Sequence, residues 1–226
     1  MLNFVIAMDT LYYALLILAA YLIGSIPSSI WLGKIFFQLD IREHGSGNAG
    51  AANTFRVLGW KAGITVLLFD VFKGWISVRL GHCAHLFPEY SEALMTQELL
   101  LGTAAALGHI FPVYARFKGG KGVATFLGVA LALAIWPTIV SIGVYIIVVL
   151  AFNYVSLGSI VAGIMFPVSV IFFFKTKYPY HSLEIFSILI ALLLIYTHRS
   201  NIKRIIRGEE SHASDLMKKK KTGKES

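Results

Sequence analysis

Residues 123–152, VATFLGVALALAIWPTIVSIGVYIIVVLAF, decide the fold of this chain. They form an apolar run of about thirty positions, interrupted near its middle by Trp136 and Pro137. A helix that spans a bilayer needs about 20 apolar residues. The run therefore has two interpretations. It is either one long span or a tight hairpin of two helices of about 14 residues each that turns at Pro137, where proline interrupts helical hydrogen bonding.

Apolar runs also fill most of the remaining chain. Hydrophobic residues make up 57% of the 226 residues and charged residues 14%, whereas soluble domains are about half apolar and a quarter charged. We find no internal repeat and no soluble domain. The sequence therefore predicts an all-α polytopic membrane protein with the lipid bilayer as its partner. The other expected spans are residues 11–37, 63–80, 99–114, 158–174 and 183–197.

The distribution of positive charge chooses between the two interpretations. Of the 20 Lys and Arg, 16 lie in residues 34–61, 116–121 and 199–224. Cytoplasmic loops carry an excess of Lys and Arg, and only the hairpin places all three groups on one side. We therefore predict seven transmembrane helices, with the N-terminus outside and the C-terminus inside. The expected organisation is a membrane domain over residues 1–207 and a basic cytoplasmic tail over 208–226. Topology also explains the net charge of +8 without a nucleic-acid partner.

The first motif with chemical potential is HGSGNAGAANTFR, residues 44–56, in the loop expected after the first span. Small residues let the backbone approach a ligand closely, and glycine permits positive φ. Arg56 offers a planar fork that matches phosphate oxygens. The alternative is a plain polar connector. The neutral hydrogen-bonding candidates of this motif are Ser46, Asn48, Asn53 and Thr54.

The second motif runs from GHIFP at residues 108–112 to RFKGGKGVAT at residues 116–125. Its glycines are expected to present backbone N–H groups to a ligand, and the run leads into a helix whose N-terminus attracts anions. A Walker A loop needs Ser or Thr after Gly-Lys, but Gly122 follows Lys121, which disfavours nucleotide hydrolysis. His109, near the inner end of its span, is either a structural hydrogen bonder or a site residue. The phosphate-loop candidates are Lys118, Gly119, Gly120, Lys121, Gly122 and Thr125.

Two shorter motifs and one charged pair complete the set. YVSLGS, residues 154–159, contributes Ser156, and residues 197–209 contribute a polar, basic segment. Asp70 and Lys73 lie three residues apart within an expected span, which places them on one helix face. Ionisable groups at that depth are usually paired or functional. We expect a structural ion pair that faces the bundle.

Taken together, the segments GSGNAGAANTFRVLG, GHIFPVYARFKGGKGVAT, YVSLGS and THRSNIKRIIRGEE resemble the acyl-phosphate:glycerol-3-phosphate acyltransferase family (PlsY-type). The resemblance covers nearly the whole chain. It implies a multi-pass enzyme of the bacterial cytoplasmic (inner) membrane whose active site faces the cytoplasm. By similarity, Ser46 and Arg56 belong to the site, residues 118–122 form a phosphate loop, and a C-terminal motif supplies His198, Asn201 and Glu209.

The reaction that the resemblance implies is acyl transfer from acyl-phosphate to the 1-hydroxyl of sn-glycerol 3-phosphate. The products are 1-acyl-sn-glycerol 3-phosphate, or lysophosphatidate, and phosphate, in phospholipid biosynthesis. It also suggests the enzyme that makes acyl-phosphate as a partner. The residue chemistry agrees, because donor and acceptor both carry phosphate and the chain offers two basic glycine-bearing motifs. An acyl-phosphate is already activated, so we expect no metal and no cofactor.

The residues leave two questions open. The general base could be His109, His198 or a phosphate oxygen of the substrate, and Ser46 as an acyl-enzyme nucleophile has no adjacent base in the sequence. The catalytic candidates are Ser46, Arg56, His109, Lys121 and Asn201. A transporter of organic phosphates is the competing function. Transporters often show inverted repeats, and the polar motifs of this chain are expected on one membrane face, which favours the enzyme.

Overall fold

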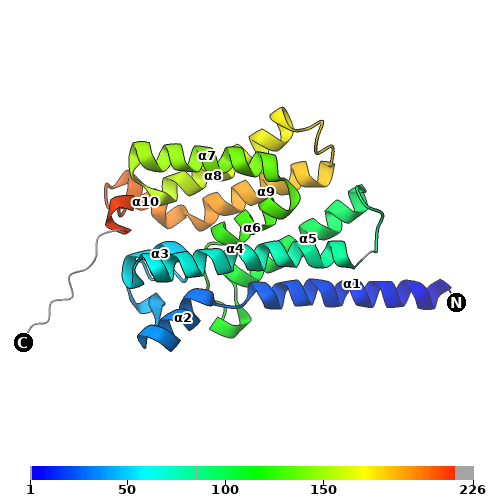
Figure 1. Ribbon diagram of the computed structural model, residues 1–226, viewed down its shortest axis with the longest axis horizontal. Coiled ribbons are helices and arrows are strands. Elements are labelled where there is room, and N and C mark those ends of the chain that lie inside the picture. The colour runs from blue at the N-terminus through cyan, green and yellow to red at the C-terminus, as the bar shows by residue number, and fades with distance from the viewer. Residues whose placement is uncertain (1, 85, 217–226) are drawn as a thin grey trace, which may run out of the picture.

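The computed structural model describes residues 2–84 and 86–216, and over these residues the regular structure is entirely helical. The longer helices lie roughly along one axis and form a bundle (Figure 1). The helices are α1 Leu2–Gly24, α2 Ser28–Phe37, α3 Ala51–Leu58, α4 Trp60–Cys83, α5 Glu92–Ile110, α6 Val123–Leu133, α7 Ile135–Phe152, α8 Val155–Val168, α9 His181–Thr197 and α10 Arg199–Ile206. Short turns of helix are η1 Ile41–Glu43, η2 Val113–Ala115, η3 Ser169–Phe173 and η4 Ala213–Leu216.

The apolar run over residues 123–152 is broken and doubles back. Helix α6 ends at Leu133, Ala134 leaves helical geometry with φ −146° and ψ 75°, and α7 begins at Ile135. The break lies three residues before the predicted turn at Pro137, and the arms have 11 and 18 residues rather than about 14 each. Pro137 falls in the first turn of α7, where a missing N–H removes no helical hydrogen bond. The turn position was therefore predicted slightly wrongly.

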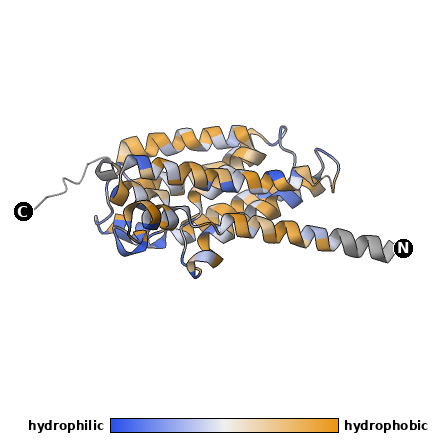
Figure 2. Cartoon of the chain, turned by 60° about the horizontal axis from the view of Figure 1, so that its bottom comes forward, coloured by the Kyte–Doolittle hydropathy of each residue, from blue (hydrophilic) through white to orange (hydrophobic). Residues whose placement is uncertain are grey.

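Composition makes several of these helices suited to a bilayer. Three segments, Glu92–Ala115, Ile135–Phe152 and Val155–Phe173, are long and apolar enough to cross one, or up to five if two bent helix pairs each count as one span. The bent pairs are Thr10–Gly24 with Ser28–Phe37, and His181–Thr197 with Arg199–Ile206. Hydrophobic residues cover the helix shafts, while hydrophilic ones gather towards the ends (Figure 2).

The first expected span, residues 11–37, is two helices. Helix α1 ends at Gly24, and Pro27 precedes α2, which leaves the axis of α1 by 40°. Proline fixes its own φ and disfavours helical geometry in the residue before it, so the break falls where the sequence carries Pro27. The break brings Ile26 and Ser28 beside α4, where Lys73 Nζ donates to the Ile26 carbonyl at 3.0 Å.

Glycine contacts bring α4 and α6 close together. A Cβ added to Gly128 would lie 1.9 Å from the Val71 carbonyl oxygen, and one added to Gly74 would lie 2.1 Å from the Thr125 carbonyl oxygen. Small residues permit such close backbone approach between helices in membranes. Because α6 begins directly after the second motif, this contact fixes where that motif meets the rest of the bundle.

One end of the bundle collects the polar motifs. Helices α2, α3 and α10 lie at the left of Figure 1, whereas the loops that follow α4 and η3 lie at the right with the N-terminus. Both ends of the 123–152 run lie at the motif-bearing end, because Lys121 contacts Asn201 there and Asn153 bonds to Ser214. We call this end of the molecule the motif end.

Candidate active site

The glycines of the second motif seat the loop against α5. The N–H of Gly119 donates to the Ile110 carbonyl at 3.2 Å, and that of Gly120 donates to the His109 carbonyl at 3.1 Å. A Cβ on Gly119 would lie 2.0 Å from the His109 carbonyl oxygen. These two N–H groups, predicted to face a ligand, therefore bond to the last turn of α5, and only glycine fits there. Gly122 adopts φ +84° as the N-cap of α6, a conformation that favours glycine.

The first motif is part loop and part helix. Arg56 was predicted in a loop, but it lies on α3, which begins at Ala51, so that placement was wrong. Asn53 organises the loop before it. Its side-chain amide donates to the carbonyls of Ile41 and His44, each at 3.0 Å, and its oxygen accepts from Ser46 N–H at 2.8 Å. The buried Asn53 side chain is thus fully used in holding the loop.

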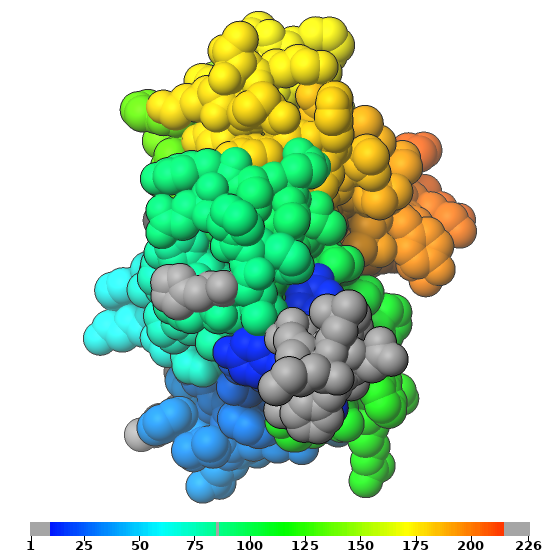
Figure 3. All heavy atoms as spheres, turned by 90° about the vertical axis from the view of Figure 1, so that its right-hand side faces the viewer, coloured from blue at the N-terminus to red at the C-terminus, as the bar shows by residue number. Residues whose placement is uncertain are grey.

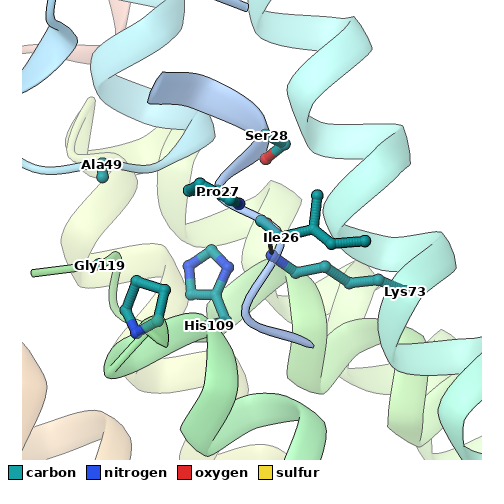
Figure 4. Close-up of a pocket in the computed structure, with 8 residues that line it drawn as sticks. Ile26, Pro27, Ser28, Ala49, Lys73, His109 and Gly119 are labelled. Carbon is teal, nitrogen blue, oxygen red and sulfur yellow. Dashed lines mark hydrogen bonds between the residues drawn. The ribbon is translucent and has the colours of Figure 1, made fainter. Parts of the chain in front are cut away.

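The two glycine-bearing motifs touch each other beside His109. A small cavity of about 10 Å³, measured as space for the centre of a water molecule, is lined by Ala49 of the first motif, Gly119 of the second and His109 (Figure 4). That is close to the smallest space that holds one water. Lys73 and residues 26–28 close its other side.

Asp70 and Lys73 form the expected ion pair inside the bundle. Lys73 Nζ lies 2.8 Å from Asp70 Oδ1, and the two side chains are 2% and 1% exposed. Ser28 Oγ donates to the same carboxylate oxygen at 2.7 Å, and His109 Nδ1 lies 3.6 Å from it. The prediction of a buried pair facing the bundle is confirmed. His109 joins this cluster on one side and the glycine loop on the other.

Glu210 is the centre of a second polar network at the motif end. Its Oε1 accepts from Ser156 Oγ and from Asn201 Nδ2, each at 2.7 Å, and its Oε2 accepts from Arg204 Nε at 2.7 Å. Lys121 Nζ donates to the other side of the Asn201 amide, at Oδ1. One chain of hydrogen bonds therefore joins the second motif to the two shorter motifs, residues 154–159 and 197–209.

Burial and charge set the pKa values in this network. Burial lowers the pKa of Lys121 to about 8, while the nearby Glu210 carboxylate opposes that shift and Arg204 and Arg56 reinforce it. Burial alone would raise the pKa of Glu210, but hydrogen bonds from Asn201, Ser156 and Arg204 outweigh it and hold the pKa below its usual value. Lys121 and Glu210 are both ionised at neutral pH.

His198 is a neutral member of the same network. Burial first, and then the charge of Lys121, lower its pKa to about 4. Its Nδ1 lies 2.8 Å from the Leu194 carbonyl oxygen, which only accepts, so Nδ1 carries the proton and Nε2 offers a lone pair. A group this weakly basic holds a proton poorly near pH 7. His198 is therefore suited to hydrogen bonding with a ligand.

Arg56 contributes an unsatisfied donor. Its Nε is buried and has no hydrogen-bond partner among the described residues. Buried polar groups are nearly always hydrogen bonded, so this N–H requires an acceptor that the chain itself does not supply. The charges of Arg56, Arg204 and Glu210 all act on Lys121, so three cations lie near one carboxylate. A phosphate group, with a charge of about −1.5 to −2 near pH 7, would balance that excess.

The other predicted residues occupy varied positions. Ser46 and Lys118 are exposed, Asn48 is partly buried, and Thr54 is buried with its hydroxyl donating to the Gly50 carbonyl at 3.1 Å. Thr125 is fully buried, with its backbone packed against Gly74 of α4. No group of three or more His, Cys, Asp or Glu side chains suited to a metal ion occurs in the described part of the chain.

Sequence reasoning missed the residue at the centre of the network. It named Glu209, but Glu209 is exposed and the neighbouring Glu210 is buried. The positive φ of Gly208, +69°, turns the chain after α10 so that Glu210 points back to Asn201. Two later residues also bond to the bundle, since Ala213 N–H donates to the Asn153 carbonyl at 2.7 Å and Ser214 N–H donates to Asn153 Oδ1 at 3.0 Å. The predicted tail, residues 208–226, thus includes residues that bond to the bundle.

Comparisons of sequence and of fold with known proteins identify the same family. A profile of the family described as Glycerol-3-phosphate acyltransferase matches residues 14–208. A Glycerol-3-phosphate acyltransferase of Chlorobaculum tepidum is 42% identical over 90% of this chain and 97% of that protein, and one of Chlorobaculum parvum is 42% identical over 89% and 96%. The described fold is similar to a crystal structure of PlsY (YgiH), an integral membrane glycerol 3-phosphate acyltransferase, in its glycerol 3-phosphate form. The TM-score is 0.79 at 35% identity, covering 89% of this chain and 95% of that one.

Proposed function

The chain belongs to the glycerol-3-phosphate acyltransferase family, and we propose that it transfers an acyl group from acyl-phosphate to the 1-hydroxyl of sn-glycerol 3-phosphate. The products are 1-acyl-sn-glycerol 3-phosphate and inorganic phosphate. The observation that carries this proposal is the buried, unpartnered Arg56 Nε beside a cationic cluster. Both substrates bring the phosphate oxygens that such a donor requires.

The residues of the motif end divide the work by their chemistry. Arg56 and Lys121 hold phosphate oxygens and neutralise the charge that develops on the leaving phosphate. Glu210 fixes the side-chain amide of Asn201, whose oxygen in turn orients Lys121. Neutral His198 offers Nε2 as an acceptor for a substrate hydroxyl.

The transfer itself balances without any further reactant. The 1-hydroxyl oxygen bonds to the acyl carbon, the bond from that carbon to the phosphate oxygen breaks, and the phosphate leaves with the electron pair. The hydroxyl proton needs an acceptor. His198 is too weak a base, with a pKa of about 4, and the His109 ring is buried between Asp70 and the glycine loop. We assign the proton to an oxygen of the substrate's own phosphate.

The donor distinguishes this proposal from other acyltransferases. Purified protein in detergent is incubated with labelled glycerol 3-phosphate and either acyl-phosphate or acyl-CoA of the same chain length. We expect labelled lysophosphatidate with acyl-phosphate only, and the same rate with EDTA. Equal turnover of both donors would refute the acyl-phosphate assignment. Accumulation of glycerol 3-phosphate in sealed vesicles, without acylation, would instead support a transporter.

We further propose seven spans, with the motif end in the cytoplasm of a bacterium and the N-terminus outside. The count adds α4 and α6 to the five spans that length and composition support. Helix α4 is long enough at 24 residues, but it carries Asp70 and Lys73 in its middle. Impermeant labelling of single cysteines tests the proposal. Positions 46 and 201 should be protected in sealed cells and position 177 should react, whereas labelling at Ser156 from outside would contradict it.

A further inference from the structure

The end of the bundle opposite the motif end contains a cavity of about 530 Å³. It lies among the end of α4, the start of α5, the end of α6 and the loop between η3 and α9. Figure 3 looks onto this end, where the yellow segment around residue 175 lies directly beside the green segment around residue 95. The cavity lies far along the bundle from Arg56 and Lys121, so the acyl-transfer chemistry does not account for it.

The cavity wall carries charges of both signs that the protein leaves incompletely matched. Glu98 is buried, and the nearest basic side chain is His82, with Nδ1 3.6 Å from Oε1. That is too long for a hydrogen bond. The charge of Arg79 also acts on Glu98, from a distance of more than 4 Å. A buried carboxylate without a close cationic partner is costly, and a cationic donor from a ligand would lower that cost.

Two cations on the wall contact aromatic rings instead of carboxylates. Arg79 lies over the Trp75 ring with its guanidinium carbon 6.0 Å from the centroid, and Lys177 Nζ lies 4.9 Å from the Trp136 centroid. Neither cation has a carboxylate within 4 Å among residues 2–84 and 86–216. Both remain available to an anionic group.

The surroundings place this cavity at the boundary between lipid and water. Trp75 and Trp136 are exposed, and Tyr178 and Tyr180 line the cavity. Trp and Tyr concentrate at membrane interfaces, where phospholipid headgroups lie. Apolar side chains of α5 and α6, including Leu94 and Leu133, line part of the wall and suit the first carbons of acyl chains. The exposed Glu89 adds a second carboxylate to the wall.

We propose that this cavity binds a bilayer phospholipid whose headgroup carries both a phosphate and an ammonium, as in phosphatidylethanolamine. The phosphate lies between Arg79 and Lys177, and the ammonium lies against Glu98. A purely anionic headgroup would leave Glu98 unmatched. The site is independent of the proposed acyl transfer, because neither acyl-phosphate nor glycerol 3-phosphate contains an ammonium.

Native mass spectrometry of the full chain in detergent, titrated with dioleoyl phosphatidylethanolamine or dioleoyl phosphatidylglycerol, tests the site. We expect phosphatidylethanolamine to bind about tenfold more tightly. Glu98→Gln should remove that preference, since it exchanges a charge-assisted hydrogen bond for a neutral one. Lys177→Ala should weaken both lipids about tenfold through loss of the phosphate contact.

Matched controls separate a site from general lipid coating. Lys175→Ala removes a neighbouring cation that pairs with Glu184 outside the cavity, and Glu43→Gln removes an exposed acid at the motif end. Both should leave lipid binding unchanged. Equal binding of the two lipids by the unaltered protein would overturn the proposal. Because Lys177 is exposed, its variant should fold even if Glu98→Gln does not, and unchanged lipid binding by Lys177→Ala would overturn it as well.

Discussion

Two charged clusters inside this molecule differ in their balance of positive and negative charge. Around Asp70, one carboxylate meets one ammonium from Lys73, and the same oxygen, Oδ1, accepts from Ser28 and lies 3.6 Å from His109 Nδ1. Its Oδ2 has no hydrogen-bond partner among the described residues. Around Glu210, one carboxylate is outnumbered by Lys121, Arg204 and Arg56. The first cluster pairs one positive charge with one negative charge. The second has an excess of positive charge that a bound anion would balance.

This difference in charge balance distinguishes buried charges that stabilise the fold from buried charges that bind a ligand. Lys73 also donates to the Ile26 carbonyl at 3.0 Å, so the Asp70 cluster ties the break between α1 and α2 to α4. The Arg56 Nε has no partner within the described chain. We expect that removing a charge from the balanced cluster lowers the stability of the protein. Removing a cation from the unbalanced cluster should instead weaken ligand binding.

The largest expected effect is on stability, from Asp70→Ala. Removing one partner of a buried ion pair costs about 3 to 5 kcal/mol, because the other charge stays buried without compensation. For a chain of this size that lowers the melting temperature by about 6 to 20 °C. Thermal unfolding in detergent, followed by circular dichroism, measures it.

Lys34→Ala is the matched control for Asp70→Ala. It breaks an ion pair with Asp40 in which the lysine side chain is 55% exposed, and exposed pairs contribute at most about 1 kcal/mol. The melting temperature should barely move. If the Asp70→Ala protein melts at the same temperature as the unaltered protein but is inactive, the Asp70 cluster serves catalysis and does not stabilise the fold.

The next largest effect is on turnover, from Arg56→Ala and Lys121→Ala. Each removes a charge-assisted hydrogen bond to phosphate of about 1.5 to 3 kcal/mol, which is about tenfold to a hundredfold in rate. Melting temperatures should stay close to the original, since the cluster has cations in excess. Steady-state kinetics with both substrates varied measures the loss.

The kinetic pattern also shows which substrate each residue holds. A rise in KM for glycerol 3-phosphate with unchanged kcat indicates contact with the acceptor's phosphate in ground and transition states alike. A fall in kcat indicates contact with the departing phosphate. Lys220→Ala, in the basic tail, should change neither constant. Near-normal activity of both Arg56→Ala and Lys121→Ala would remove the phosphate-site assignment.

Much of this arrangement could be predicted from sequence, because its causes are local. Hydropathy indicates the helices, and the i,i+3 spacing of Asp70 and Lys73 predicts their shared face. The break at Pro27 was not predicted, since residues 11–37 were expected to form one span. Two features of the site could not be predicted from the sequence, because they depend on tertiary contacts. The glycines of residues 119–120 look like a ligand cradle, yet their N–H groups bond to α5. The choice of Glu210 over Glu209 depends on how the chain turns at Gly208.

A smaller effect separates those two adjacent glutamates. Glu210→Gln replaces an ionised acceptor of three hydrogen bonds, from Ser156, Asn201 and Arg204, with a neutral amide that faces Arg204 with a donor. We expect a loss of about 1 to 3 kcal/mol, seen as a lower melting temperature together with reduced activity. Glu209→Gln, at an exposed position, is the matched control and should change the melting temperature little. Equal behaviour of the two variants would contradict the network.

The smallest effect is a pH dependence that belongs to the Glu210 cluster alone. Lys121 has a pKa of about 8 because of burial, so it is charged below pH 8 and neutral above. The ratio kcat/KM reports ionisation of the free enzyme. It should therefore halve near pH 8 and fall about tenfold by pH 9, after subtraction of alkaline hydrolysis of the donor. An ordinary lysine, with a pKa of about 10.4, would hold its charge through this range. Bound phosphate stabilises the ammonium, so kcat should fall only at higher pH. In Lys121→Arg the guanidinium stays charged, and the decline above pH 8 should disappear even if the overall rate is lower. A kcat/KM that stays level to pH 9.5 in the unaltered protein would contradict a lowered pKa at a substrate-binding Lys121.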